Sequence, residues 1–227
     1  MTHPVIVEVR AALEKAADPV KAPKMQAYMK STMPYRGVSS PEQKAIWKAV
    51  FLAHPLSSSH EWQEVALKLW REATFREERY GAIALTGLRQ YASHRTMDAI
   101  PMFEEMIVTG AWWDFVDAIA GRQLGDVLRA QPARMAKLMR RWSRDPQMWK
   151  RRSSILCQLM FKGDTDLKLL YDCIEPNLAD KQFFIRKAIG WALRQHAWTD
   201  PREVKRYVKA NKSRLSGLSV REALKNV

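Results

Sequence analysis

Arg79-Tyr80-Gly81-Ala82 is one copy of a segment that recurs along this chain of 227 residues. Other copies begin at residues 43, 151, 186 and 221, so neighbouring starts lie 35 or 36 residues apart, with one gap of 72. Half of that gap predicts a copy at 115, where Phe115-Val116-Asp117-Ala118-Ile119 stands. The third position is small in every other copy: Ala45, Gly81, Ser153, Ala188 and Ala223. Asp117 breaks this rule, and a repeat that buries a charge usually has a use for it.

The period predicts the fold class. Two short helices in each unit of about 36 residues are typical of an all-α superhelical solenoid. Neighbouring units stack to bury one continuous core, and their inner helices line a concave face. The Trp, Leu-Gly and Tyr pattern of tetratricopeptide repeats is absent, which favours about six HEAT-like helix pairs. No linker divides the chain, so we expect a single domain over residues 1–227.

Apolar residues at three- and four-residue spacing predict individual helices, and no segment alternates as a strand would. The predicted helices are Trp62–Glu72, Glu78–Tyr91, Pro101–Val108, Met135–Trp142, Trp149–Phe161, Asp166–Ile174 and Phe183–His196.

The charge balance indicates a polyanionic partner. The chain carries 38 Lys and Arg against 24 Asp and Glu, a formal net charge of +14. An excess of this size favours nucleic acid as the partner, although a basic surface without a specific ligand is the simpler alternative. Arginine opens four copies of the segment, so the predicted concave face would follow a nucleic-acid backbone.

Neither a membrane span nor a disulfide is expected. No apolar run reaches the ~18–20 residues that a membrane helix needs. The first residues contain acidic side chains and are interpreted as a helix, not a signal peptide. Cys157 and Cys173 fall within helical patterns, consistent with reduced thiols. We therefore expect a bacterial cytoplasmic protein.

Three further residues occupy positions in the repeat that would place them near Asp117. Trp113 lies four residues before Asp117 and shares its helix face. Arg152 follows in the next copy, and Trp191 fills a position held by Ala84, Ala120 or Leu156 elsewhere. Stacked helices would bring all four together. Indoles pack against a sugar, and a carboxylate stabilises positive charge at an anomeric carbon or orients a water, as glycosidic bond cleavage requires. An arginine can hold a flanking phosphate.

Each of these residues also has a simpler interpretation. Tryptophans at helical spacing more often lie in a core, and an Asp early in a helix more often caps it or faces solvent. The five histidines are scattered, and we expect them at the surface and not in catalysis. No zinc-ligand spacing or helix-hairpin-helix motif is present, and neither a metal nor a cofactor is expected.

The stretches AWWDFVDAIAGRQLGD (111–126), MWKRRSSILCQL (148–159) and FFIRKAIGWALRQHA (183–197) resemble the AlkD family of DNA alkylation repair enzymes. The resemblance runs over essentially the whole chain. It implies a HEAT-like repeat DNA glycosylase that removes cationic N3- and N7-alkylated purines from duplex DNA. It also implies that the lesion stays stacked in the duplex instead of being flipped into a pocket.

The same resemblance implies roles for individual residues. Asp117 matches the catalytic carboxylate, Trp113 and Trp191 the tryptophans that flank the deoxyribose, and Arg152 a contact to the DNA backbone. Tyr28 matches an aromatic residue near the lesion strand. Met160 departs from the family, since a basic residue is expected there. The remaining DNA contacts are expected from the basic cluster, namely Arg151, Arg186, Lys187 and Arg194.

The sequence thus predicts a monomeric, monofunctional glycosylase that leaves an abasic site, because no lysine obviously lies near the carboxylate to form a Schiff base. Two alternatives stay open. The first is a non-catalytic HEAT-repeat protein that binds damaged or branched DNA. The second is a protein-binding scaffold, which the charge disfavours.

Overall fold

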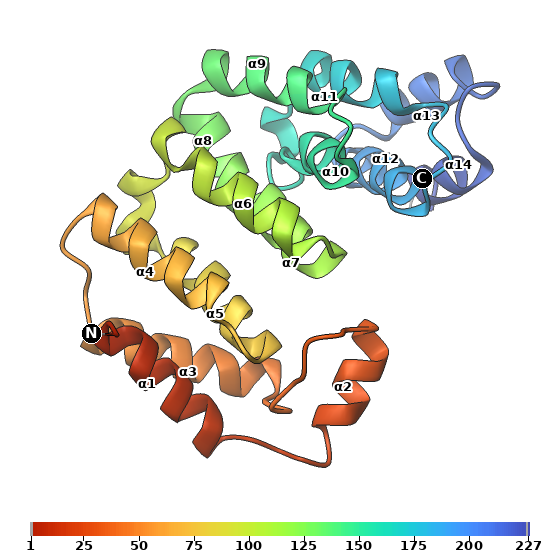
Figure 1. Cartoon of the computed structure of the whole chain (residues 1–227). Coiled ribbons are helices and arrows are strands. Elements are labelled where there is room, and N and C mark those ends of the chain that lie inside the picture. The colour runs from red at the N-terminus through yellow and green to blue at the C-terminus, as the bar shows by residue number, and fades with distance from the viewer. Residues whose placement is uncertain (1, 226) are drawn as a thin grey trace. The chain divides into compact units, whose positions relative to one another are not determined.

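The computed structural model describes residues 2–225 and residue 227. All secondary structure within this part of the chain is helical, which confirms the predicted all-α repeat fold. The chain forms two compact units, Met1–His94 and Arg95–Val227 (Figure 1). Each unit is described by itself.

In the first unit, α1, α3 and α5 contact one another, and α4 packs against α5. Its helices are α1 (Pro4–Lys15), α2 (Ala22–Met29), α3 (Ser40–Ala53), α4 (Ser59–Arg71), α5 (Arg76–Thr86) and the short η1 (Arg89–His94).

The second unit holds two rows of helices. α9 and α11 contact each other in one row, and α10, α12 and α14 follow one another in the next (Figure 1). Its main helices are α6 (Ile100–Gly110), α7 (Trp113–Ala118), α8 (Gly125–Ala130), α9 (Pro132–Trp142), α10 (Met148–Leu156), α11 (Leu167–Ile174), α12 (Phe183–Ala197), α13 (Pro201–Ala210) and α14 (Gly217–Ala223). Short helices η2 (Met97–Ala99), η3 (Ile119–Leu124), η4 (Lys162–Asp164) and η5 (Glu175–Asn177) lie between them.

All six copies of the recurring segment are helical, and they lie in α3, α5, α7, α10, α12 and α14. The small third position has a packing reason. A Cβ added to Gly81 would stand 3.1 Å from the ring of Trp47, because α5 packs closely on α3. Ser153, Ala188 and Ala223 are buried in the same way, whereas Ala45 of the first copy is exposed. Within each unit, the repeat therefore marks helices that stack on one another: α3 and α5 in the first, and α7, α10, α12 and α14 in the second.

Several helices begin at a capping residue. Asp166, Asp200 and Ser216 each accept a hydrogen bond from the backbone N–H three residues later and so begin α11, α13 and α14. Two predicted helices were too long. α5 ends at Thr86 and not at Tyr91, because Gly87 caps it, and α10 ends at Leu156 and not at Phe161.

Candidate active site

Asp117 lies on a helix that changes its winding at that point. Trp113 is the first residue of α7, after a turn in which Ala111 adopts a left-handed conformation (φ 43°). Such a conformation is strained for a residue other than glycine. Directly beyond Asp117 and Ala118, the chain continues as the π-helix η3. Single π-turns within α-helices occur often at functional sites, and nothing in the sequence pattern predicted this one.

A cavity of about 300 Å³ opens beside Asp117 in the second unit. The structure brings together Trp113, Asp117, Arg152 and Trp191, the four residues that the repeat argument placed on neighbouring helices. Lys187 and Arg194 also line it. Three lining residues were missed: Phe183, Phe184 and Glu222. The cavity thus combines aromatic walls with charges of both signs.

Arg152 and Asp117 form a paired charge within this cavity. Arg152 Nε donates to Oδ1 of Asp117 and Nη2 donates to Oδ2, each over 2.7 Å. The side chains are only 5% and 12% exposed. Burial raises the pKa of Asp117 above its ordinary value, while the hydrogen bonds from Arg152 act in the opposite direction. Asp117 is therefore neither a helix cap nor a solvated charge, the two simpler interpretations of its position.

Arg152 makes a third contact that fixes its position. Nη1 donates to the backbone carbonyl of Phe184 on α12. The guanidinium thus joins α7, α10 and α12 around the cavity. The prediction that Arg152 contacts a DNA phosphate stays a prediction, since in the free protein its donors are directed at these two partners.

An aromatic cluster stands behind the cavity. The Phe184 ring centroid lies 5.1 Å from that of Trp149 and 5.6 Å from that of Trp112. Phe183 packs edge-on against Phe184 and is 58% exposed. Phe183 and Phe184 begin α12, within a stretch on which the family resemblance rests. Sequence reasoning missed them because helical periodicity alone predicts an ordinary core position for both.

Glu222 supplies a second carboxylate to the cavity. Its Oε1 lies 2.9 Å from Nζ of Lys187 and its Oε2 lies 2.9 Å from Nη1 of Arg194. Glu222 stands at the second position of its copy of the repeat, where Arg152 and Lys187 stand in theirs. Its place in the repeat could therefore have identified Glu222 as a residue that faces the cavity.

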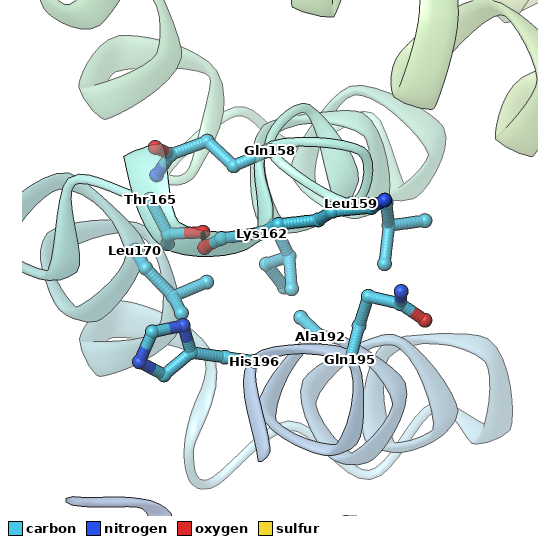
Figure 2. Close-up of a pocket in the computed structure, with 9 residues that line it drawn as sticks. Gln158, Leu159, Lys162, Thr165, Leu170, Ala192, Gln195 and His196 are labelled. Atoms are coloured by element: carbon cyan, nitrogen blue, oxygen red, sulfur yellow. Dashed lines mark hydrogen bonds between the residues drawn. The ribbon is translucent and has the colours of Figure 1, made fainter. Parts of the chain in front are cut away.

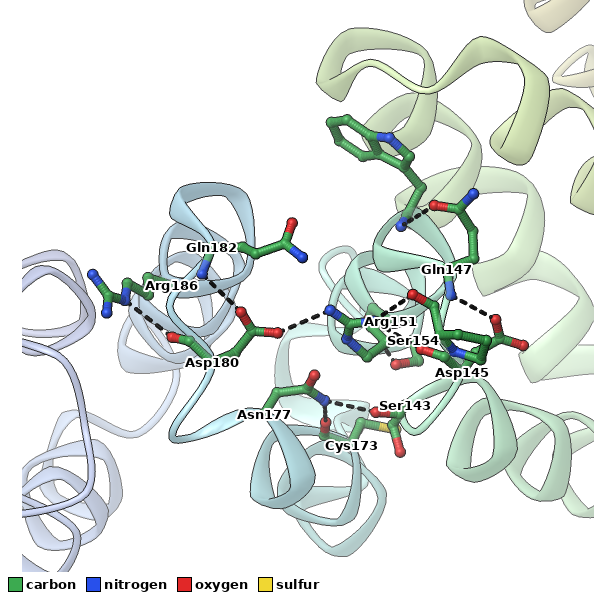
Figure 3. A network of polar contacts seen from close by, with 12 residues as sticks. Ser143, Asp145, Gln147, Arg151, Ser154, Cys173, Asn177, Asp180, Gln182 and Arg186 are labelled. Atoms are coloured by element: carbon green, nitrogen blue, oxygen red, sulfur yellow. Dashed lines mark hydrogen bonds and ion pairs between the residues drawn. The ribbon is translucent and has the colours of Figure 1, made fainter.

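Two further residues predicted to bind DNA are held in a polar network outside the cavity (Figure 3). Arg151 Nη2 donates to Oδ2 of Asp180 over 2.9 Å, and its Nη1 donates to the carbonyls of Asp145 and Pro146. Arg186 Nε donates to the backbone carbonyl of Asp180. These contacts join α10 and α12 through Asp180, so both arginines have a structural role in the free protein.

Tyr28 and Met160 are both exposed. Tyr28 lies on α2 in the first unit and is 80% exposed, so its ring is available to a ligand. Met160 is exposed in the second unit, where Arg129 Nη2 donates to its carbonyl. A cation thus stands beside the position at which the family pattern expects one.

His196 corrects the expectation that all histidines lie at the surface, because it is only 7% exposed. Its ring lines a cavity of about 10 Å³ between the end of α10, α11 and α12, with Gln158, Leu170 and Gln195 (Figure 2). A space of that size holds no more than one water molecule. It is too small for a substrate and is not a candidate active site.

Comparisons with known proteins agree with the resemblance. The model of a family described as DNA alkylation repair enzyme matches residues 9–227. A solved structure described as a predicted DNA alkylation repair enzyme from Enterococcus faecalis is similar, with 30% sequence identity and a TM-score of 0.82. The match covers 93% of this chain and 96% of that one. No curated protein matches. Within the described residues, no helix has the length and apolarity to span a bilayer.

Proposed function

Because the chain belongs to the family of DNA alkylation repair enzymes, we propose that it is a monofunctional DNA glycosylase that hydrolyses the N-glycosidic bond of cationic N3- and N7-alkylated purines in duplex DNA. The observation that carries the proposal is the position of the Asp117 carboxylate in a cavity shared with Trp113 and Trp191. We further propose that it acts as a monomer, without a cofactor.

The chemistry begins with a good leaving group. An alkyl group at N3 or N7 leaves a positive charge on the purine, so the bond from C1′ to the base breaks with both electrons going to the base. The base departs as a neutral alkylpurine and needs no proton from a general acid. The deoxyribose becomes an oxocarbenium ion, a water adds at C1′, and that water releases one proton.

Asp117 would act on the sugar. Its carboxylate stabilises the oxocarbenium ion and orients the attacking water. Arg152 is a positioning residue, because its two donors fix the plane of the carboxylate. The faces of Trp113 and Trp191 attract the cation through their π electrons and exclude competing water. Trp113 and Phe183 are partly exposed, which suits an enzyme that meets a stacked lesion at the duplex surface.

Base release from defined duplexes tests the proposal. Matched duplexes carry a single N7-methylguanine, a single N3-methyladenine or a single uracil, and free bases are quantified by mass spectrometry. We expect release of both cationic purines, no release of uracil, and an abasic strand that stays intact until alkali is added. Release of uracil at a comparable rate, or no release from any duplex, would refute it.

A non-catalytic binder of damaged or branched DNA is the alternative. Four of the predicted DNA-binding cations are engaged with carboxylates in the free protein: Arg151, Arg152, Lys187 and Arg194. That pairing would leave affinity for undamaged DNA low. Tight, salt-dependent binding to the methylated duplexes without base release favours this alternative.

A further inference from the structure

Glu222 pairs with two cations on the helix face that carries Trp191. Lys187, Trp191 and Arg194 are spaced by four and three residues along α12, so the three side chains share one face. Each oxygen of the Glu222 carboxylate contacts a different cation, Lys187 Nζ or Arg194 Nη1, at 2.9 Å. One anion with two acceptor oxygens therefore bridges the two cations.

This arrangement matches the chemistry of a phosphodiester. A backbone phosphate also offers two non-bridging oxygens and one negative charge, and Lys and Arg are its usual partners. The bridged pair lines the same cavity as Asp117. A phosphate bound between Lys187 and Arg194 would therefore lie beside Trp191 in this cavity. The hydrogen bond from Lys187 lowers the pKa of Glu222, which keeps this carboxylate anionic at neutral pH.

The backbone that carries Glu222 is held in place, whereas its side chain can turn. Gly190 on α12 lets α14 approach so closely that an added Cβ would lie 2.5 Å from the Cβ of Glu222 and 2.9 Å from the carbonyl oxygen of Ser219. The carboxylate lies beyond this contact, and rotation about the Cβ–Cγ and Cγ–Cδ bonds can move it while Cβ stays in place. An entering anion can replace it through a rotamer change, with α14 staying packed on α12.

We propose that Lys187 and Arg194 form a phosphodiester-binding site beside Trp191, and that Glu222 occupies this site as a phosphate substitute until duplex DNA displaces it. The inference rests on the proposed function only in that the ligand is duplex DNA. Glu222 thereby lowers affinity for DNA and disfavours duplexes that cannot supply a phosphate at this position.

Binding to an unmodified, fluorescently labelled duplex tests the proposal, with affinity measured by anisotropy over a range of salt concentrations. Glu222→Gln is expected to bind about two- to fivefold more tightly than wild type, the gain that corresponds to releasing a partly exposed ion pair. The slope of log affinity against log salt is expected to become steeper, because in wild type the displaced Glu222 carboxylate takes up a salt cation while the DNA releases its own, and the variant has no carboxylate to do so.

Glu203→Gln is the matched control, because it changes the net charge equally. Glu203 also engages an arginine with both oxygens, and its side chain is 16% exposed against 17% for Glu222, but it lies on α13 and does not line the cavity. Equal tightening by both variants means that net charge alone is responsible, and it overturns the proposal. Weaker binding by Glu222→Gln also overturns it, since Glu222 would then support binding.

A double-mutant cycle measures the competition between Glu222 and DNA even if Glu222→Gln alters stability. Arg194→Gln is expected to weaken binding more in the Glu222→Gln background than in wild type, because only there is the cation free of its competitor. Equal losses in the two backgrounds contradict the competition. Since the readout is binding to undamaged DNA, absence of base release would refute the proposed glycosylase and leave this test intact.

Discussion

The guanidinium of Arg152 holds both carboxylate oxygens of Asp117, with Nε–Oδ1 and Nη2–Oδ2 distances of 2.7 Å. The two residues come from α10 and α7, one copy of the repeat apart, and a third bond from Arg152 reaches the carbonyl of Phe184 on α12. Three successive helices of the repeat are thus joined at the residue that the proposed reaction needs most.

Arg152→Lys tests whether this fork positions the carboxylate. Lysine keeps the charge but cannot donate in parallel to two oxygens. We expect release of N7-methylguanine to fall by about ten- to a hundredfold, the loss typical of a misplaced catalytic group. The loss should appear in kcat with KM little changed, measured by steady-state base release. An unchanged kcat would mean that the pair serves the fold alone.

The pH dependence of base release follows from the burial of Asp117. The proposed active form is the anion, so activity is expected to fall as the pH is lowered through the pKa of this carboxyl. Burial raises that pKa, so the fall begins at higher pH than for an exposed Asp. The measurement is kcat/KM against pH, with spontaneous depurination subtracted. A flat profile down to the pH of unfolding would show that no such ionisation matters.

The two cavity tryptophans are expected to act on the cation. Trp113→Ala and Trp191→Ala should each slow release of N7-methylguanine by about two- to thirtyfold, which corresponds to a lost cation–π contact of ~0.5–2 kcal/mol. Trp198 is 71% exposed and does not line the cavity, so Trp198→Ala serves as the control and should keep full activity. Parallel loss in all three variants would point to a general effect on folding.

Gly190→Ala tests the close approach of α14 to α12. The added methyl would meet backbone atoms of Ser219 at 2.9 Å and 3.2 Å, which cannot be relieved by a side-chain rotation. We expect a loss of about 1–3 kcal/mol in the free energy of unfolding, measured in urea, although alanine is the better helix former. Gly163 has no heavy atom within 4 Å of its added Cβ, so Gly163→Ala should be nearly neutral. Equal stabilities would contradict the packing.

Glu203 allows a test of stability against pH. Hydrogen bonds from Arg206 and then Tyr171 lower the pKa of Glu203 from 4.5 to about 2. Since the folded state holds the carboxyl with the lower pKa, its stabilisation is complete above pH 4.5 and is lost as the pH falls towards 2. Glu203→Gln should therefore unfold at a lower temperature than wild type at neutral pH, and the difference should vanish in acid. A difference in unfolding temperature that stays the same at every pH would contradict the lowered pKa of Glu203.

Much of the fold could be predicted because stacked helices require a pattern of small and apolar residues that repeats along the sequence. A small residue at the third position lets one helix of the repeat pack closely on the next, as Gly81 on α5 does against Trp47 on α3. Six helices and the neighbourhood of Trp113, Asp117, Arg152 and Trp191 follow from that register. The π-helix beyond Asp117 could not be predicted, because it changes the winding of the helix without changing the spacing of the apolar residues.

The partners of the long charged side chains could not be predicted. A period of 35 or 36 residues places Arg151, Lys187 and Arg194 on helices, but their ion pairs with Asp180 and Glu222 depend on how far flexible side chains reach. Net charge suggested free cations along a DNA-binding face. The structure instead gives these cations partners in the free protein, and any DNA contact they make has to replace those partners or add to them.

Release of N7-methylguanine by Asp117→Asn measures whether the reaction depends on the Asp117 carboxylate. Asparagine keeps the size of the side chain and one acceptor for Arg152 but lacks the charge that the oxocarbenium ion requires. We predict that single-turnover release from a methylated duplex falls by about a hundred- to a thousandfold or more, with duplex binding and the circular dichroism spectrum unchanged. If a folded, DNA-binding Asp117→Asn protein releases the base at the wild-type rate, Asp117 is not the catalytic carboxylate.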